Sequence, residues 1–358
     1  MKKSFLMLAI AALALASCSQ DEPVSVNHGR QIDFRPVMGT LSRATETTNA
    51  NLSDITVTAL LGDQTLFKNV VFTKDAGFYT STPAYYWPGD DSQLDFYAYS
   101  PSQPGGTIAI DSNNKTLTDF SPAAEISDQV DFISSYATGK KSVNEASGVE
   151  LTFDHRLAQI EIQGKTNNDA YTFKVMGVRI GEPVSKASFD FSTDAWTLST
   201  ASTDRSIYET TYNDTITLGA EPVTLMATVA ESGASDNAML IPQELTAWDP
   251  TADASNTAKG AYLAVKLQIK TAETGAQVYP FPSDANCIWA AVPISNKWEA
   301  GKKYVYTLDF THGAGYVDPH DPQPGTPILG GPIKFTVDVT GWENQSIDED
   351  MTTYNGEE

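Results

Sequence analysis

KYVYTLDF, residues 303–310, is the stretch that decides the fold, because apolar and polar side chains alternate along it. Successive side chains of an extended chain point to opposite faces. One face holds Tyr304, Tyr306, Leu308 and Phe310. The other holds Val305, Thr307 and Asp309. This period of two predicts a β-strand that turns one face to a core.

Three further stretches alternate in the same way, and almost no segment outside the first residues has a helical period. Their apolar faces comprise Ile55, Val57, Ala59 and Leu61; Val265, Leu267 and Ile269; and Ile333, Phe335, Val337 and Val339. Turn-forming segments such as Pro88-Gly89-Asp90-Asp91 separate such runs. The pattern predicts an all-β sandwich fold, and 358 residues are enough for two such domains.

A polar, turn-like segment at residues 139–148 marks the expected boundary between the two domains. We expect an N-terminal β-sandwich domain over residues 31–146, a C-terminal one over 147–345 and an acidic tail over 346–358. Just after the boundary, the apolar face of residues 151–157 falls on odd positions and then moves to Ile160 and Ile162. This change predicts a β-bulge near Ala158.

The first residues have the parts of a lipoprotein export signal. Lys2 and Lys3 are positive, and the apolar run at residues 5–15 is too short to span a bilayer as a helix. Small residues then precede Cys18, as attachment of a lipid to that cysteine requires. We therefore expect a signal peptide at residues 1–17, a lipid on Cys18 and a flexible tether over residues 18–30.

The charge of the chain restricts its partners. It carries 23 Lys and Arg against 45 Asp and Glu, a net charge of −22 that becomes −24 without Lys2 and Lys3. Such an acidic surface disfavours nucleic acid and anionic lipid surfaces as partners. Cys18 and Cys287 are the only cysteines. With Cys18 lipidated no internal disulfide is possible, so the fold rests on burial, and we expect Cys287 to be a small buried hydrophobe.

Motifs of catalysis are missing from the sequence, which contains no Gly-x-Ser-x-Gly, phosphate-binding glycine loop or zinc-protease helix. Only His312 and His320 approach metal-ligand spacing, in a loop with Asp318 and Asp321. The loop is a weak metal site or simply polar, and we favour the second. His155 falls on an apolar strand face and is expected to be a core histidine with a polar partner. We predict no enzyme activity, no cofactor and no metal site.

A dense group of aromatic residues allows two interpretations. It is either a face on which sugars stack or part of a strand-rich core, since strands are rich in aromatic residues. The group comprises Tyr85, Tyr86, Trp87, Phe96, Tyr97 and Tyr99. We favour the core, and expect Trp87, Trp289 and Trp342 to pack there.

Several segments carry a family resemblance through their order and spacing. They are the lipid site at Cys18, QIDF at 31–34, LSRAT at 41–45, YWP at 86–88, LDFYAYSP at 94–101, LTFDHRLA at 151–158, KYVYTL at 303–308 and VDVTGW at 337–342. The chain resembles the fimbrillin-like pilins of Bacteroidetes, relatives of the major and minor fimbrial subunits of Porphyromonas. The acidic residues after Cys18 also resemble the signal that these bacteria use to place lipoproteins on the outer face of the outer membrane.

The resemblance implies two transthyretin-like β-sandwich domains in tandem and a subunit, tip or accessory component of a surface fimbria that serves cell adhesion. In that family a trypsin-like protease cuts the lipidated precursor after an arginine at the outer membrane. The first strand is then lost, and a strand from another subunit fills the groove by β-strand addition.

This chain has residues suited to that mechanism. Ile32 and Phe34 alternate with polar residues in a plausible first strand, which Pro36 is expected to interrupt. Arg43 follows in a small, polar stretch able to enter a protease cleft. We expect cleavage after Arg43, with Arg30 and Arg35 as weaker candidates.

The donor strand and the adhesion receptor stay open. Residues 333–339 alternate as a donor needs, but the same residues suit a permanent strand of the second domain. The tail after Trp342 is too acidic for a good donor. The expected partners are other fimbrial subunits, the outer membrane through the lipid, and a host or glycan receptor. The alternative function is a monomeric, surface-anchored lipoprotein that binds glycans, and a lipid-anchored hydrolase is a third class.

Overall fold

Nearly all regular structure in the described part of this protein is β-strand. The computed structural model describes residues 26–38, 47–48, 51–75, 77–227, 236–252, 260–280 and 288–341. Within these ranges only a single turn of 3₁₀-helix, η1 (Ile126–Asp128), and one of α-helix, α1 (Lys141–Asn144), interrupt the strands. The predicted all-β class is confirmed. None of the helices in the described ranges has the length and apolar character needed to cross a membrane.

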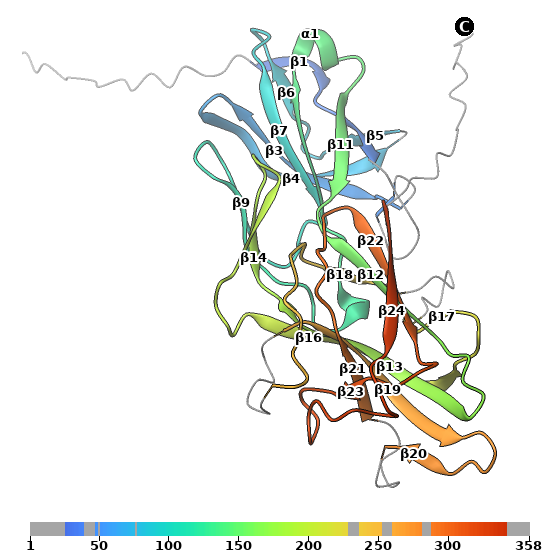
Figure 1. Cartoon of the computed structure of the whole chain (residues 1–358). Coiled ribbons are helices and arrows are strands. Elements are labelled where there is room, and N and C mark those ends of the chain that lie inside the picture. The colour runs from blue at the N-terminus through green and yellow to red at the C-terminus, as the bar shows by residue number, and fades with distance from the viewer. Residues whose placement is uncertain are drawn as a thin grey trace, which may run out of the picture.

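Seven of the described strands close into a barrel, the upper half of Figure 1. In order around the barrel they are β10 (Ile133–Gly139), β11 (Val149–His155), β2 (Phe34–Met38), β5 (Phe78–Thr80), β4 (Gln64–Asp75), β3 (Asp54–Leu61) and β7 (Leu94–Ser100). A pair of strands, β1 (Val26–Gln31) and β6 (Tyr86–Pro88), lies beside it. The N-terminal part is therefore a barrel closed by strand pairing, whereas the expectation from the sequence is a β-sandwich domain.

The barrel interior explains the alternation around residues 55–61. Ile55, Val57 and Ala59 are fully buried inside it, in one cluster with Phe34 and Phe96. The other face of β3 is also buried, although threonines occupy two of its positions, because another sheet covers the outside of the barrel there. The predicted core face is therefore confirmed.

The lower half of Figure 1 is a sandwich of two sheets around one core. One sheet holds β17 (Val223–Thr224), β12 (Ala158–Lys165), β22 (Lys302–Asp309) and β24 (Lys334–Gly341), with β18 (Ala238–Leu240) paired to β12. The other holds β16 (Arg205–Thr217), β13 (Tyr171–Val184), β19 (Tyr262–Thr271), β21 (Ile288–Pro293) and β23 (Tyr316–Val317), with β20 (Gln277–Tyr279) paired to β19.

The alternating stretches of β22 and β19 supply the core of this sandwich. The apolar face of β22 is at most 3% exposed, and that of β19 is fully buried, as predicted; the residues are Tyr304, Tyr306, Leu308 and Phe310, and Val265, Leu267 and Ile269. The edge strand β24 behaves differently. Its Phe335 and Val337 are half-buried and Val339 is 54% exposed, because β22 is its only strand partner among the described residues.

A third sheet joins the two halves. It consists of β8 (Thr107–Ile110) and β9 (Lys115–Phe120) from the first half and of β14 (Ala187–Asp190) and β15 (Ala195–Leu198) from the second. Its side chains form a separate aromatic core against the outside of the barrel, in which Phe132 meets Phe189 edge to face at 5.5 Å. Strand pairing therefore crosses the expected boundary near residue 146, because β14 pairs with β9.

The predicted bulge near Ala158 is wrong. The slip of the apolar face marks the passage from the barrel strand β11 to the sandwich strand β12, with Arg156 and Leu157 between them. Arg156 stabilises this junction. Its Nε donates a hydrogen bond to Ser134 Oγ at 2.7 Å, and its Nη2 forms an ion pair with Asp194 Oδ1 at 2.8 Å. The polar segment 139–148, taken for a domain boundary, is a connection between the paired strands β10 and β11. The division of the chain into two domains stays a prediction.

Candidate functional site

The candidate site is the seam at which β2 closes the barrel. On one side β2 runs parallel to β11, in a register that pairs Phe34 with Val149 and Met38 with Phe153. On the other side a single pairing, of Phe34 with Tyr79, joins it to β5. Pro36 lies inside β2 opposite Leu151, so the prediction that it interrupts the strand is wrong. Proline has no backbone N–H to donate, and this is tolerated at Pro36 because only one pairing joins β2 to β5.

Apolar side chains of this first segment fill the barrel interior. Ile32 and Phe34 are fully buried and Met38 is 3% exposed. The Phe34 ring meets Phe72 and Phe96 edge to face at 4.8 and 5.1 Å. Burying each such side chain stabilises a fold by about 1.5–3 kcal/mol. The segment is therefore held by side-chain burial more than by its strand pairing on the β5 side.

A buried carboxylate oxygen lies beside the seam. Oδ1 of Asp33 is buried and lacks a hydrogen-bond partner among the described residues. Burial raises the pKa of the Asp33 carboxyl above its ordinary value, and the charges of Arg30 and Arg35 oppose that rise. Gly148, just before β11, has a φ of +72°, and a Cβ there would come within 2.8 Å of Asp33 Oδ1. The seam therefore leaves no room for a side chain at residue 148.

The two residues predicted to be modified, Cys18 and Arg43, lie outside the described residues. The weaker cleavage candidates lie within them. Arg30 is in β1, which pairs with β6. Arg35 is in β2 opposite Glu150, whose carboxylate lies 4.0 Å from the guanidinium in an exposed ion pair. Both belong to paired strands, whereas a protease needs the backbone around its target bond unpaired.

The aromatic group expected to be either a sugar-stacking face or a core is mostly core. Trp87, Phe96 and Tyr99 are at most 2% exposed and Tyr97 is 9% exposed. The Trp87 ring meets Phe96 edge to face at 5.9 Å inside the barrel. Their rings are therefore not available as an open platform. Trp289, 7% exposed, is also buried, as predicted, and Trp342 lies outside the described residues.

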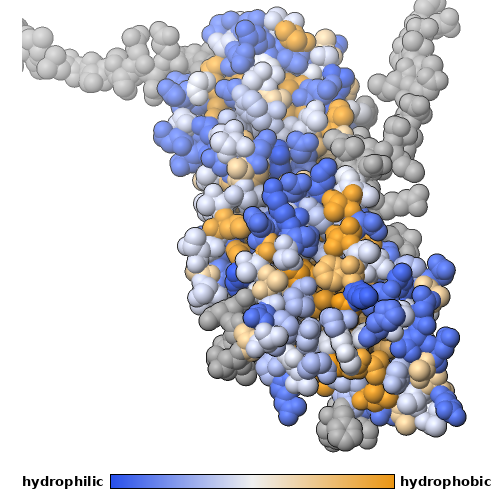
Figure 2. Space-filling model, in the orientation of Figure 1, coloured by the Kyte–Doolittle hydropathy of each residue, from blue (hydrophilic) through white to orange (hydrophobic). Residues whose placement is uncertain are grey.

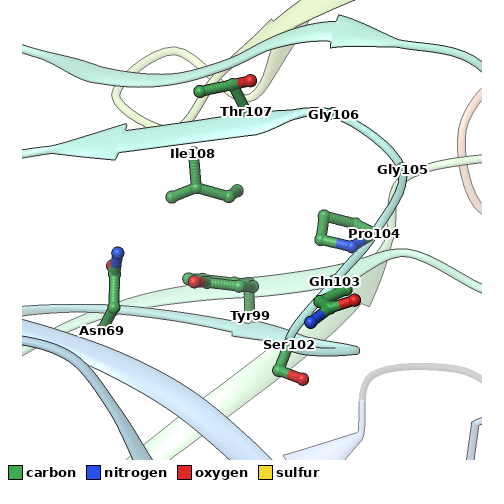
Figure 3. A pocket seen from close by; sticks show the side chains of 9 residues that line it. All are labelled: Asn69, Tyr99, Ser102, Gln103, Pro104, Gly105, Gly106, Thr107 and Ile108. Carbon is green, nitrogen blue, oxygen red and sulfur yellow. The ribbon is translucent and has the colours of Figure 1, made fainter.

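A hollow of about 520 Å³ lies beside this group, between β8 and the barrel. Figure 3 shows Ile108 reaching down from β8 toward the Tyr99 ring, with Asn69 at one end and Gln103 at the other. Burial raises the pKa of the Tyr99 hydroxyl to about 12, so it stays protonated at neutral pH. The hollow is open to solvent, but its aromatic ring is covered and offers no stacking surface.

The loop of His312 and His320 is held by internal pairs. Asp318 is fully buried, and its Oδ2 lies 3.1 Å from Arg179 Nη1. Nε2 of His320 lies 3.0 Å from Oε1 of Glu182. Asp321 accepts a hydrogen bond from the backbone N–H of Trp289 at 3.1 Å. Across the described ranges, no cluster of three or more metal-ligating side chains occurs.

The strand that pairs with β2 was not predicted from the sequence. β2 pairs with a strand more than a hundred residues further along the chain, in parallel orientation. Nothing in the local pattern of either segment indicates that pairing. Ile-x-Phe occurs at residues 32–34 and at 333–335, but this shared pattern does not identify the partner strand of either segment.

Comparisons with known proteins agree with this architecture. A family model described as fimbrillin-like matches residues 42–342. A fimbrial protein from Bacteroides vulgatus ATCC 8482 is similar in structure, with a TM-score of 0.56 at 18% identity over 88% of this chain and 100% of that one. A protein from Bacteroides ovatus ATCC 8483, described as a cell adhesion protein, gives 0.51 at 15% identity over 89% and 100%. No curated protein matches the sequence.

Proposed function

The chain belongs to the fimbrillin-like family, and from that premise we propose that it is a subunit, tip or accessory component of a surface fimbria that serves cell adhesion. The observation that carries the proposal is the seam at β2. Residues 32–38 bury three apolar side chains in a barrel, and their strand β2 is joined on one side by a single pairing. Such a strand is suited to replacement by one of the same shape.

The proposal begins with export and anchoring. Cys18 carries the lipid, and the precursor is held at the outer membrane with its body at the cell surface. The sequence of the signal and the fimbrillin-like family membership support this step. Two or more acyl chains on one cysteine hold a protein at a membrane far more firmly than one chain does.

Cleavage after Arg43 follows. Arg30 and Arg35 are the alternatives, and their place in paired strands disfavours both. Arg43 lies after the end of β2 and before β3, so a cut there separates the whole first segment from the rest of the barrel. The released piece takes with it Ile32, Phe34 and Met38.

Loss of that piece leaves a groove suited to a new strand. One edge of β11 loses its parallel partner, and the rings of Phe72 and Phe96 lose their contact with Phe34. Exposed edges and apolar surface of this kind favour β-strand addition. A strand from another subunit can restore the pairing with β11 and the contacts of the two rings. It would run parallel to β11 and carry apolar side chains at alternate positions.

The edge strand β24 of another subunit is our candidate donor. Its apolar positions continue from Ile333 through Phe335 and Val337 to Val339, with the same spacing as Ile32 and Phe34. Figure 2 shows apolar side chains gathered where β24 runs along the surface. Ile333 is buried in the core of its own sandwich and Phe335 and Val337 pack against that core. The support for a role outside the sandwich is therefore the exposed Val339 and the single strand partner of β24 among the described residues.

The alternative function, a monomeric lipoprotein that binds glycans, is less well supported. It expects an open aromatic platform, and the rings of Trp87, Phe96 and Tyr99 are buried. A hydrolase is supported by no motif in the sequence. The fimbrillin-like family is of a structural type, so we propose no enzyme activity.

Arg43→Ala tests the cleavage step in cells that carry the natural assembly system. We expect the substitution to abolish surface polymer, seen by electron microscopy and as a ladder on gels of unboiled samples. Arg30→Ala is the matched control, and we expect it to polymerise normally. Normal surface polymer in cells that carry Arg43→Ala would contradict the proposed cleavage after Arg43.

A further inference from the structure

A buried carboxylate holds the chain just after the expected cleavage position. The backbone N–H of Thr47 donates a hydrogen bond to Oδ2 of Asp131 at 3.0 Å. The two residues are 84 positions apart in the sequence. This contact therefore ties the start of the retained chain to a distant part of the barrel.

The same oxygen has a second partner. Nδ1 of His155 lies 2.8 Å from Oδ2 of Asp131, and the side chains are 2% and 1% exposed. The expectation that His155 is a core histidine with a polar partner is confirmed. His155 ends β11 and pairs with Ile133 at the start of β10, so the contact sits where two barrel strands meet.

Burial of the Asp131 and His155 side chains has an energetic cost. A carboxylate removed from water costs several kcal/mol unless other groups compensate it. Oδ1 of Asp131 is buried without a hydrogen-bond partner among the described residues. At a position that only fills space, apolar side chains are more stabilising than a buried pair of polar side chains. The feature that apolar residues cannot supply is an acceptor for the Thr47 N–H.

The residues that follow extend this attachment. The backbone N–H of Leu52 donates to the Thr48 carbonyl at 2.8 Å, and the Leu52 side chain is 3% exposed in the barrel core. On the other side of Arg43, Met38 is 3% exposed and paired with Phe153. Arg43 therefore lies between two segments that are each fixed to the barrel.

We propose that Asp131 and His155 form a clamp that keeps the retained chain end on the barrel after cleavage. This inference rests on the proposed cut after Arg43. With Thr47 held, the new terminus at Ala44 stays within three residues of a fixed point. The segment that leaves extends through β2. The segment that stays runs from Thr47 into β3, and the clamp holds its start on the barrel.

The test uses the full mature chain with Cys18→Ser, cut under native conditions by an arginine-specific protease and then trimmed by an aminopeptidase. Intact mass reports where trimming stops. We expect the wild-type clamp to stop it at or before Thr47. In Asp131→Asn, and more completely in Asp131→Leu/His155→Phe, we expect trimming to continue toward Leu52. Asp128→Asn, the same change at an exposed site nearby, serves as the matched control.

Hydrogen–deuterium exchange on the uncut chain provides a measurement that does not depend on cleavage. A hydrogen bond to a charged acceptor predicts exchange at Thr47 that is about tenfold faster in Asp131→Asn and about a hundredfold faster in the double variant. The core strand β19 reports whether each variant is folded, and Asp131→Asn keeps the side-chain volume at residue 131. If the protease does not cut after Arg43, the cleavage proposal fails while the exchange result still tests the clamp. Equal trimming and equal exchange in all variants would overturn it.

Discussion

The two segments that carry Ile-x-Phe, residues 32–34 and 333–335, are alike in sequence, and both isoleucines are buried, but the apolar residues that follow differ in burial. Ile32 and Phe34 enter the barrel interior and are fully buried. In β24, Phe335 is only half-buried and Val339 is 54% exposed. The same alternation therefore gives a core strand at one end of the chain and an edge strand at the other.

Strand partners explain the difference. β2 lies between β11 and β5, inside a closed barrel whose interior needs its side chains. β24 lies outside β22 at the rim of a sandwich whose core comes mainly from strands such as β12, β19 and β22, and Phe335 and Val337 only partly enter that core. A pattern of period two states that a strand has an apolar face, but the number of neighbours decides how much of that face is buried.

Truncation of one apolar side chain in each strand gives the largest expected contrast. Phe34→Ala removes a ring from a closed barrel core, and we expect it to lower the free energy of unfolding by about 3–5 kcal/mol. Val339→Ala, at a mostly exposed position, is expected to cost less than about 1 kcal/mol. Denaturant unfolding of both variants measures the difference. Similar costs for the two would mean that β2 is not part of the barrel core.

A pair of glycines gives a smaller contrast. Gly148 and Gly330 both have positive φ, but a Cβ meets Asp33 and Phe78 only at Gly148 and meets nothing within 4 Å at Gly330. We expect Gly148→Ala to cost roughly 2–3 kcal/mol and Gly330→Ala about 1 kcal/mol. Thermal unfolding tests this ranking, and a reversed order would show that the seam is loosely packed.

The smallest expected effect is the pH dependence of the seam. Since burial raises the pKa of Asp33 in the folded protein, its carboxyl favours the folded state below the unfolded pKa. That contribution is lost as pH rises through the folded pKa. We therefore expect Asp33→Asn to raise the melting temperature at pH 7 and to match the wild type near pH 3. A lower melting temperature at pH 7 would contradict this account.

Much of the fold follows from the sequence because burial alternates with the side chains. The apolar faces of residues 304–310 and 265–269 point into the sandwich core as expected. The shift of the apolar face before Ile160 marks a real structural change, the passage from the barrel to the sandwich. A β-bulge and a change of sheet give the same local pattern, however. Only the pairing of β11 with β2 and of β12 with β22 distinguishes them.

The rest depends on contacts between distant segments. Closure of the barrel needs β2 beside β11, and the joining sheet needs β14 beside β9. The contact of Thr47 with Asp131 likewise has no local signature. Cys18 and Arg43, the residues that the sequence does single out, lie outside the described residues and stay predictions.

The most direct test of the central claim is the amino terminus of the protein recovered from fimbriae on the native cell surface, determined by intact mass and terminal sequencing. The account predicts a chain that begins at Ala44, without the segment that contains β1 and β2. A fimbrial chain that begins at a lipidated Cys18 and retains residues 19–43 would contradict it.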